Sequence, residues 1–373
     1  SVTSATLTLK TNATQFGGGT SILGLYPVDL SATFAAIPEE SGIAANYTND
    51  TGIEGDPNVI FTERFPDLNM EERGWWYAYF PTTERSIVGD TDSDDSNYEP
   101  LVPGMKAYKM TIPTGQYGGE FGRWSFWSNL GYEPNEVYMR VYARIGTDFD
   151  SEGGKFPFGF DGTYLVRNNL NLLNPTRTIS ANPVTGRPWI RPDAPAYAGN
   201  GGATSNGTNG WSFRGGFMAE DCPSGSTDCA DRSPLVDAGY RALTYYSYWA
   251  DQPDYKGSEF DWSNGLLGII PKNRWVAIDQ HIKLNTVNPD GTGNHDGILE
   301  AWVDGRLAYS TNTIRERNWP GNAAGANNIK IDSVWLNLYH GGLDAAKSPM
   351  TVYLSYIVVA NSFIGATVLS GAV

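Results

Sequence analysis

The sequence predicts an all-β protein, a sandwich of two antiparallel sheets. The 373 residues include 43 glycines and 22 prolines, both above average usage, and 13% of the residues are aromatic. Several segments alternate apolar and polar residues, and no apolar pattern of helical period is sustained over three turns. Frequent turn residues between alternating segments are typical of sandwiches, whose strands each bury one face.

The clearest strand covers residues 136–145. Its apolar residues occupy every odd position from Val137 to Ile145, and tyrosine and arginine occupy the even positions between Glu136 and Ile145. One face therefore belongs to the core, and the other is either a solvated surface or a groove that binds sugars and carboxylates. The Tyr/Arg alternation favours the groove, because rings pack on sugars and guanidinium groups pair with carboxylates. The candidate substrate-binding residues here are Tyr138, Arg140, Tyr142 and Arg144.

Similar segments follow at 275–285, 298–305 and 334–342, and the second of them ends in an AspGly turn. Polar residues on these segments extend the set of candidate substrate-binding residues: His281, Lys283, Asn337 and His340. The segment 351–360 also alternates, so we expect a buried strand there and no membrane span.

The length fits two domains or one large sandwich with additions. Residues 1–104 are rich in glycine, threonine and asparagine and only weakly patterned, whereas the strand signal is strong from residue 105 onward. We therefore expect a β-rich N-terminal region at 1–104, packed on the sandwich or continuing it, and the sandwich proper at 105–373.

The formal net charge is −15, from 26 basic and 41 acidic residues. This charge repels phosphate backbones and anionic lipid surfaces, so we expect neither a nucleic-acid partner nor membrane insertion. An anionic substrate is compatible with it only if basic residues gather in one cleft. We expect Arg140, Arg144, Lys155, Arg214 and Lys283 to surround that cleft; the sequence does not indicate an oligomeric state.

Two local features concern stability. Cys222 and Cys229 are separated by six residues, and a disulfide between them would place the protein in an oxidising, extracellular compartment. Asp90, Asp92 and Asp94 stand at alternate positions, as calcium ligands do. The glycine and closing glutamate of a helix-loop-helix calcium site are missing, so the alternatives are a structural calcium site and a solvated acidic loop.

The sequence argues against several enzyme classes, because it contains none of their motifs. It has no GxSxG elbow, no HExxH, no Walker loop and no GxGxxG turn. Glu300 and Asp304 are the nearest approach to the paired carboxylates of a glycoside hydrolase. Alternation places Ser212 with Arg214, and Tyr246 with Tyr248, on common strand faces. Such residues suit β-elimination from a uronic acid, which needs a carboxylate partner, a base and an acid, and no metal or other cofactor.

Several short motifs occur in a characteristic order: ThrIleProThrGlyGlnTyrGly (111–118), GlyGlyLysPheProPheGlyPheAspGly (153–162), GlyTrpSerPheArg (210–214) and TyrHisGlyGly (339–342). With the segments at 136–145 and 274–305, they resemble the jelly-roll polysaccharide lyases of families fourteen and twenty over about residues 105–362. PheProPhe replaces the more usual LeuProGly, and an insert carrying both cysteines separates Arg214 from Tyr246.

The resemblance implies a concanavalin-like jelly roll with a concave groove and a secreted lyase that cleaves an acidic polysaccharide of alginate or glucuronan type. It assigns the catalytic set Lys155, Ser212, Arg214, Tyr246 and Tyr248. A tyrosine whose pKa is lowered by nearby cations is the expected base and acid, with Lys155 as the alternative base. The other possible functions are a non-catalytic carbohydrate-binding or surface-structural protein and a glycoside hydrolase.

Overall fold

The computed structural model describes residues 42–79, 81–89, 98–149, 153–162, 181–189, 199, 204–218, 241–262, 267–318, 329–340 and 345–367. These residues all belong to one compact unit, Pro38–Val373. None of the helices formed by them has the length and apolar character needed to cross a bilayer. The predicted Cys222–Cys229 disulfide and the predicted calcium ligands Asp90, Asp92 and Asp94 lie outside the described residues.

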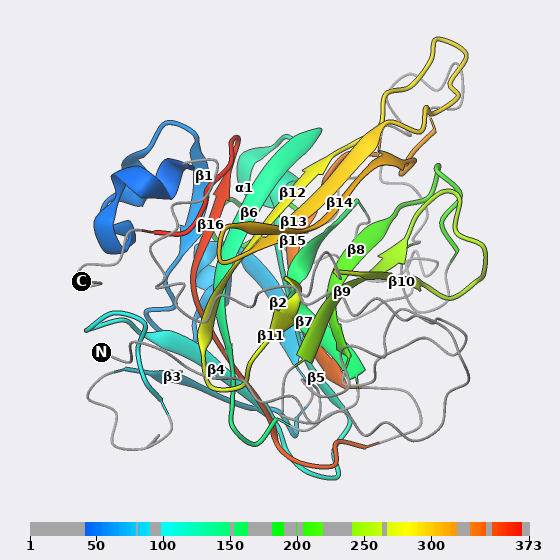
Figure 1. Ribbon diagram of the computed structural model, residues 1–373. Coiled ribbons are helices and arrows are strands. Elements are labelled where there is room, and N and C mark those ends of the chain that lie inside the picture. The colour runs from blue at the N-terminus through cyan, green and yellow to red at the C-terminus, as the bar shows by residue number, and fades with distance from the viewer. Residues whose placement is uncertain are drawn as a thin grey trace, which may run out of the picture. The chain divides into compact units, whose positions relative to one another are not determined.

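One sheet, sheet A, has eight antiparallel strands in the described part of the chain (Figure 1). Its order is β14-β13-β12-β6-β16-β4-β3, and β1 pairs with the last residues of β16. The bounds are β1 Val59–Glu63, β3 Glu84–Val88, β4 Ala107–Ile112, β6 Glu136–Ile145, β12 Trp275–Lys283, β13 Gly297–Val303, β14 Arg306–Ile314 and β16 Met350–Ala360.

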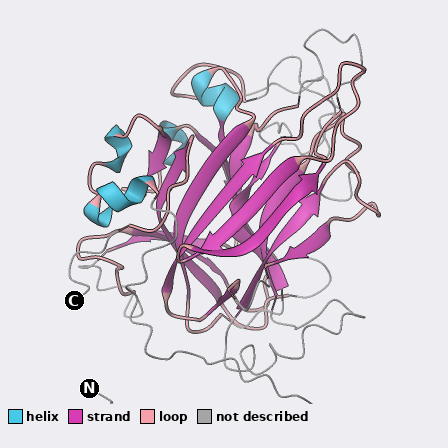
Figure 2. Cartoon of the chain, turned by 45° about the horizontal axis from the view of Figure 1, so that its top comes forward, coloured by secondary structure: helices cyan, strands magenta, loops and turns pink. Residues whose placement is uncertain are grey.

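The other sheet, sheet B, also has eight antiparallel strands among the residues described. Its order is β10-β9-β8-β7-β15-β5-β2, and the two-residue strand β11 pairs with β9. The bounds are β2 Trp75–Tyr79, β5 Gly118–Ser125, β7 Gly153–Asp161, β8 Ser212–Met218, β9 Arg241–Tyr248, β10 Ser258–Asp261, β11 Ile269–Ile270 and β15 Ser333–His340. The helices between strands, such as α1 (Phe126–Leu130), are short (Figure 2).

The core lies between the two sheets and follows the alternation seen in the sequence. All the odd-numbered residues of β6 from Val137 to Ile145 are fully buried. They share one apolar cluster with Phe156, Phe158 and Phe160 of β7, which are also fully buried. Burial of one face from each sheet supplies the main stabilising term, at about 25 cal/mol per Å² of apolar surface. The predicted antiparallel sandwich is confirmed.

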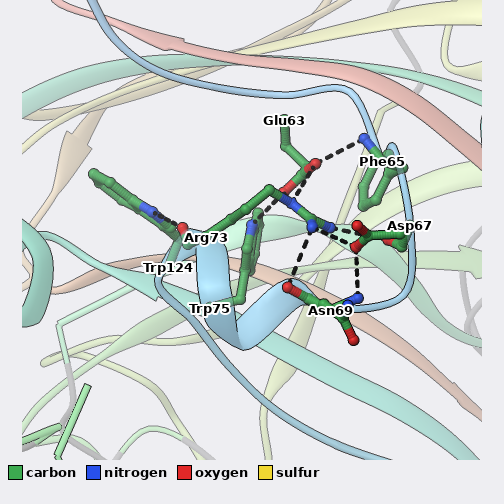
Figure 3. A network of polar contacts seen from close by, with 7 residues as sticks. All are labelled: Glu63, Phe65, Asp67, Asn69, Arg73, Trp75 and Trp124. Atoms are coloured by element: carbon green, nitrogen blue, oxygen red, sulfur yellow. Dashed lines mark hydrogen bonds and ion pairs between the residues drawn. The ribbon is translucent and has the colours of Figure 1, made fainter. Parts of the chain in front are cut away.

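Strands β1, β2 and β3 precede residue 105, and they contribute to both sheets. Figure 3 shows how the end of β1 is joined to sheet B through the buried carboxylate of Glu63. It accepts hydrogen bonds from the Phe65 backbone N–H (2.7 Å), Arg73 Nε (2.8 Å) and Trp75 Nε1 of β2 (3.0 Å). A charge-assisted network of this kind stabilises the junction, because every donor points at an ionised acceptor.

The outer face of sheet A is covered by residues 42–58, 98–105 and 361–367, which we name the sheet A cover. It includes the short helices η1 (Ile43–Asn46), η2 (Thr48–Asp50) and η3 (Ile53–Gly55), drawn in blue beside the red end of β16 in Figure 1. The backbone N–H of Ile43 donates to the Phe363 carbonyl at 3.0 Å, and this bond joins the first segment of the cover to the last. Apolar residues of the cover, such as Ile53 and Ile364, pack on Val358 of β16.

The cover explains the Tyr/Arg face of β6. Arg140 is fully buried and forms an ion pair with Asp50 of η2, and Arg144, 1% exposed, donates to the Glu99 carbonyl at 3.1 Å. Tyr142 is 4% exposed and accepts the Thr367 backbone N–H at 2.9 Å. This face is therefore a buried layer and not the groove that the alternation favoured. Rings and guanidinium groups that would suit a sugar serve equally well to bind a covering segment with its own carboxylates.

Candidate active site

Sheet B brings the five predicted catalytic residues onto the neighbouring strands β7, β8 and β9. The register pairs Lys155 with Gly216, Arg214 with Tyr246, and Ser212 with Tyr248. Because residues two positions apart on a strand share a face, these side chains stand on the face of sheet B opposite to Phe156 and Phe213, which lie in the core.

Four of the five side chains form one cluster. Lys155 Nζ lies 3.6 Å from the ring centroid of Tyr246. Arg214 Cζ lies 5.1 Å from the centroid of Tyr246, 5.4 Å from that of Tyr248 and 5.0 Å from that of Trp335 on β15. The two tyrosine rings meet edge to face at 5.6 Å. Two cationic side chains thus lie over the faces of aromatic rings, which is a favourable arrangement.

Backbone features of β7 position Lys155. Pro157 has no N–H to donate, and the pairing of β7 with β8 shifts register between Lys155 and Gly159. Gly159 has φ +142°, and a Cβ there would stand 2.3 Å from the Phe213 carbonyl oxygen. Glycine is required at this position, and the resulting bulge sets where Lys155 stands relative to β8.

The pKa of Lys155 is lowered to about 8. Burial is the largest cause and the neighbouring Arg214 is the second, while Glu259 on β10 acts in the opposite direction. Both burial and a like charge penalise the ammonium form. A substantial fraction of Lys155 is therefore neutral near pH 8 and able to accept a proton.

The pKa of Tyr246 is raised to about 12. Burial is the first cause and the Tyr248 hydroxyl the second; Arg214 and the Gly257 backbone N–H oppose them. A Cβ at Gly257 would stand 2.7 Å from the Tyr246 ring and 2.8 Å from the Tyr248 ring, so only glycine lets this loop pack on both. The expected lowering of a tyrosine pKa is not seen at Tyr246, because burial outweighs the field of Arg214. A protonated phenol suits a proton donor.

Glu259 was not predicted from the sequence, and it lies beside this cluster. The register pairs it with Tyr246, and its Oε2 accepts a hydrogen bond from Thr244 Oγ1 at 2.7 Å. The pKa of Glu259 is raised by the protein atoms crowded around it, and Lys155 is the largest opposing influence. No motif marks this residue, because β10 has only four residues and occurs in none of the matched segments.

Ser212, Asn337 and His340 occupy supporting positions on sheet B. Ser212 is fully buried, and its hydroxyl donates to the Gly199 carbonyl, which ties a loop to β8. Asn337 is fully buried, and its Nδ2 donates to the Glu120 carbonyl at 3.4 Å. His340 Nδ1 lies 3.2 Å from the carbonyl oxygen of Gly153, two residues before Lys155.

A third cationic side chain, Arg123, also lies nearby and was not predicted from the sequence. Arg123 on β5 donates from Nε to Asp161 of β7 at 2.6 Å, and its Cζ lies 3.5 Å from the ring centroid of Trp335. Because Trp335 also contacts Arg214, the two arginines share one aromatic neighbour. The contacts of this face therefore extend from β7 and β8 across β15 to β5, where the charge of Arg123 is balanced by Asp161.

The remaining predicted substrate-binding residues lie on sheet A and do not join this cluster. Tyr138 stacks on His281 at 4.1 Å, His281 bonds Glu300 at 2.8 Å and Glu136 at 3.0 Å, and Lys283 Nζ lies 3.1 Å from Glu136. Of the five cations expected around one cleft, only Lys155 and Arg214 come together. Arg140 and Arg144 are bound by Asp50 and Glu99 of the sheet A cover, and Lys283 pairs with Glu136 on sheet A.

The carboxylates considered for a hydrolase are also on sheet A. Glu300 bonds His281 through Oε2, and Asp304 pairs with Arg274 at 3.0 Å and accepts the Ala277 backbone N–H at 2.9 Å. Both therefore act as partners for neighbouring groups in the structure, on the sheet opposite to the Lys155 cluster.

Comparison with known proteins agrees with this architecture. No family model and no curated protein matches the chain. Among solved structures, an alginate lyase from Chlorella virus is 15% identical with a TM-score of 0.50, covering 81% of this chain and 99% of its own. A PL-14 alginate lyase from Aplysia kurodai is 12% identical with a TM-score of 0.50, covering 81% and 98%. An endo-β-1,4-glucuronan lyase from Trichoderma reesei is 14% identical at a TM-score of 0.40, covering 81% and 95%. The chain has the fold of the jelly-roll polysaccharide lyases.

Proposed function

We propose that the protein is a secreted polysaccharide lyase that cleaves an acidic polysaccharide of alginate or glucuronan type by β-elimination. The observation that carries this proposal is the contact of Lys155, whose pKa is about 8, with the ring of Tyr246, beside Arg214. One base, one acid and one carboxylate partner thus lie on a single sheet face. The likeness of the fold to alginate lyases supports the same chemistry.

In the proposed mechanism, Arg214 pairs with the carboxylate of the uronate, and neutral Lys155 takes the proton from C5. The electron pair moves into the carboxylate as enolate charge, which Arg214 stabilises. The C4–O bond then breaks as the C4=C5 double bond forms, and the departing oxygen takes a proton from Tyr246. Lys155 releases its proton to solvent, and the tyrosinate takes one up. Side chains perform every step, so the proposal requires no cofactor.

The direct test is incubation of the protein with alginate, glucuronan and related polyuronates. The C4=C5 bond conjugates with the carboxylate, so we expect ultraviolet absorbance to rise on at least one polymer. A flat trace on all of them, with protein shown to be folded by circular dichroism, would contradict the proposal. Retained polymer binding in that case would identify a carbohydrate-binding protein without catalysis.

Removal of the Tyr246 hydroxyl tests the assignment of the acid. Tyr246→Phe keeps the ring under Lys155, so we expect turnover to fall by about 10² to 10⁴ with KM little changed. Tyr248→Phe should lower turnover by a smaller factor, because Tyr248 acts through its contact with Tyr246. Tyr138→Phe on sheet A is the matched control and should behave as the wild type. Near-normal turnover in both Tyr246→Phe and Tyr248→Phe would show that these rings only pack.

The pH dependence follows from the pKa of Lys155. The base must be neutral, so kcat/KM should rise with pH and level off above about 8, where the amine has lost its proton. The acid stays protonated over this range, because the pKa of Tyr246 is about 12. Initial rates between pH 5.5 and 10 at constant ionic strength measure the profile. A profile that falls between pH 6 and 8 would mean that the lysine acts in its charged form.

A further inference from the structure

Glu259 acts electrostatically on Lys155, although the two residues stand on strands that are not neighbours in the sheet. Strand β8 and strand β9 separate β7 from β10. In the row of paired residues that contains Lys155, the β8 position is Gly216, the β9 position is Thr244 and the β10 position is Asp261. Glu259 belongs to the neighbouring row, which contains Tyr246 and Arg214. A glycine in this row leaves the space above β8 open between the lysine on one side and β10 on the other.

The carboxylate of Glu259 extends toward Thr244 and Gly216 of this row. Thr244 Oγ1 donates to its Oε2 at 2.7 Å, and the same oxygen lies 3.5 Å from the point at which a Cβ of Gly216 would stand. That Cβ would also be 2.5 Å from Thr244 Oγ1, so a larger residue at position 216 would displace the arrangement. The Glu259 carboxylate thus reaches from the neighbouring row to the space above Gly216, the pairing partner of Lys155, and it acts electrostatically on that lysine.

Other charged and titratable groups face Lys155 from each neighbouring strand. Tyr339 of β15 is its pairing partner, Arg214 lies on β8 and Tyr246 on β9. Asp261 holds the β10 position in the row of Lys155. Arg214 disfavours the ammonium form of Lys155, and Glu259 is the acidic group that favours it. The elimination transfers a proton to this amine, so a carboxylate that acts on it electrostatically stabilises the positive charge that develops there.

We propose that Glu259 is a positioning residue for the reaction, acting through Lys155: held by Thr244, its carboxylate extends to the space above Gly216 and strengthens the lysine amine as a base. This inference rests on the proposed lyase function. It adds a group that the sequence motifs did not contain and that has no need to touch the substrate.

The inference predicts two effects of Glu259→Gln, which keeps the shape and removes the charge. The amine becomes a weaker base, so the rate at the high-pH plateau falls several-fold. The amine also loses its proton at lower pH, so the rising limb of kcat/KM moves to lower pH. A merely structural role would lower the amount of folded enzyme without moving the limb. Glu259→Asp should restore part of both effects.

The titration of Lys155 can be measured without any substrate. Protein labelled with ¹³C at lysine Cε reports amine protonation by NMR, and Lys155→Arg identifies the signal. We expect Glu259→Gln to move the titration of Lys155 to lower pH. Glu136→Gln is the matched control, because it removes a carboxylate that pairs with a lysine on sheet A. It should leave the Lys155 signal unchanged.

An unchanged Lys155 titration in Glu259→Gln would overturn the inference, whatever the activity. If no polyuronate is cleaved, the proposed function fails, and the titration still decides whether Glu259 acts on Lys155. A shifted titration together with an unshifted rate profile would also overturn it, because the lysine would then not be the base whose protonation limits the rate.

Discussion

The Lys155→Met variant is expected to lose polyuronate turnover by a factor of about 10² to 10⁴ while it still binds the polymer, because the base that takes the C5 proton is absent. Methionine removes the amine that contacts the Tyr246 ring and keeps an unbranched side chain, which fills most of the same space. Initial rates from ultraviolet absorbance and binding by calorimetry measure the two quantities separately.

Lys283→Met is the matched control for this variant. Lys283 is about half exposed and pairs with Glu136 on sheet A, so its loss should leave turnover within a few-fold of the wild type. Equal losses in the two variants would show that general positive charge, and not a base on sheet B, supports the reaction.

The second large effect concerns stability. Arg140→Met leaves the buried carboxylates of Asp50 and Asp279 without their shared cation, and we expect a loss of roughly 3–5 kcal/mol in the free energy of unfolding. Turnover per folded molecule should stay near that of the wild type, because Arg140 lies under the sheet A cover. Denaturant unfolding measures the first quantity, and rates corrected for folded fraction measure the second.

Arg274→Met provides the control for that loss. Arg274 pairs with Asp304 at 3.0 Å with 37% of its side chain exposed, so its removal should cost less than about 1 kcal/mol. A strong loss of substrate affinity in Arg140→Met, without loss of stability, would support the hypothesis that the Tyr/Arg face of β6 is a substrate-binding groove.

The alternation of apolar and polar residues predicted the strands well, because a half-buried strand must repeat every two residues. It identified the apolar face of β6 correctly, since Val137 to Ile145 are buried between the sheets. It could not tell what contacts the other face. The sheet A cover supplies that contact, and its apolar residues follow no pattern that pairs them with β6 in advance.

For the candidate site, local motifs predicted the residues that stand on adjacent strands of sheet B. Lys155, Arg214 and Tyr246 do meet, as their contacts show. Their protonation could not be predicted, because burial of Tyr246 depends on the loop at Gly257. Glu259 was missed because its position depends on strand order and on the open space above Gly216.

The sheet A cover also constrains the order of events during synthesis. Thr367 Oγ1 donates to the Tyr47 carbonyl across a separation of 320 residues, so the first part of the cover lacks its contacts with residues 361–367 until those residues have left the ribosome. Until then Tyr142 lacks the Thr367 backbone N–H that it accepts in the folded protein. Closing so long a loop is entropically costly and slow, and ribosome-bound chains that stop before residue 361 should therefore be cleaved readily by protease within residues 42–58.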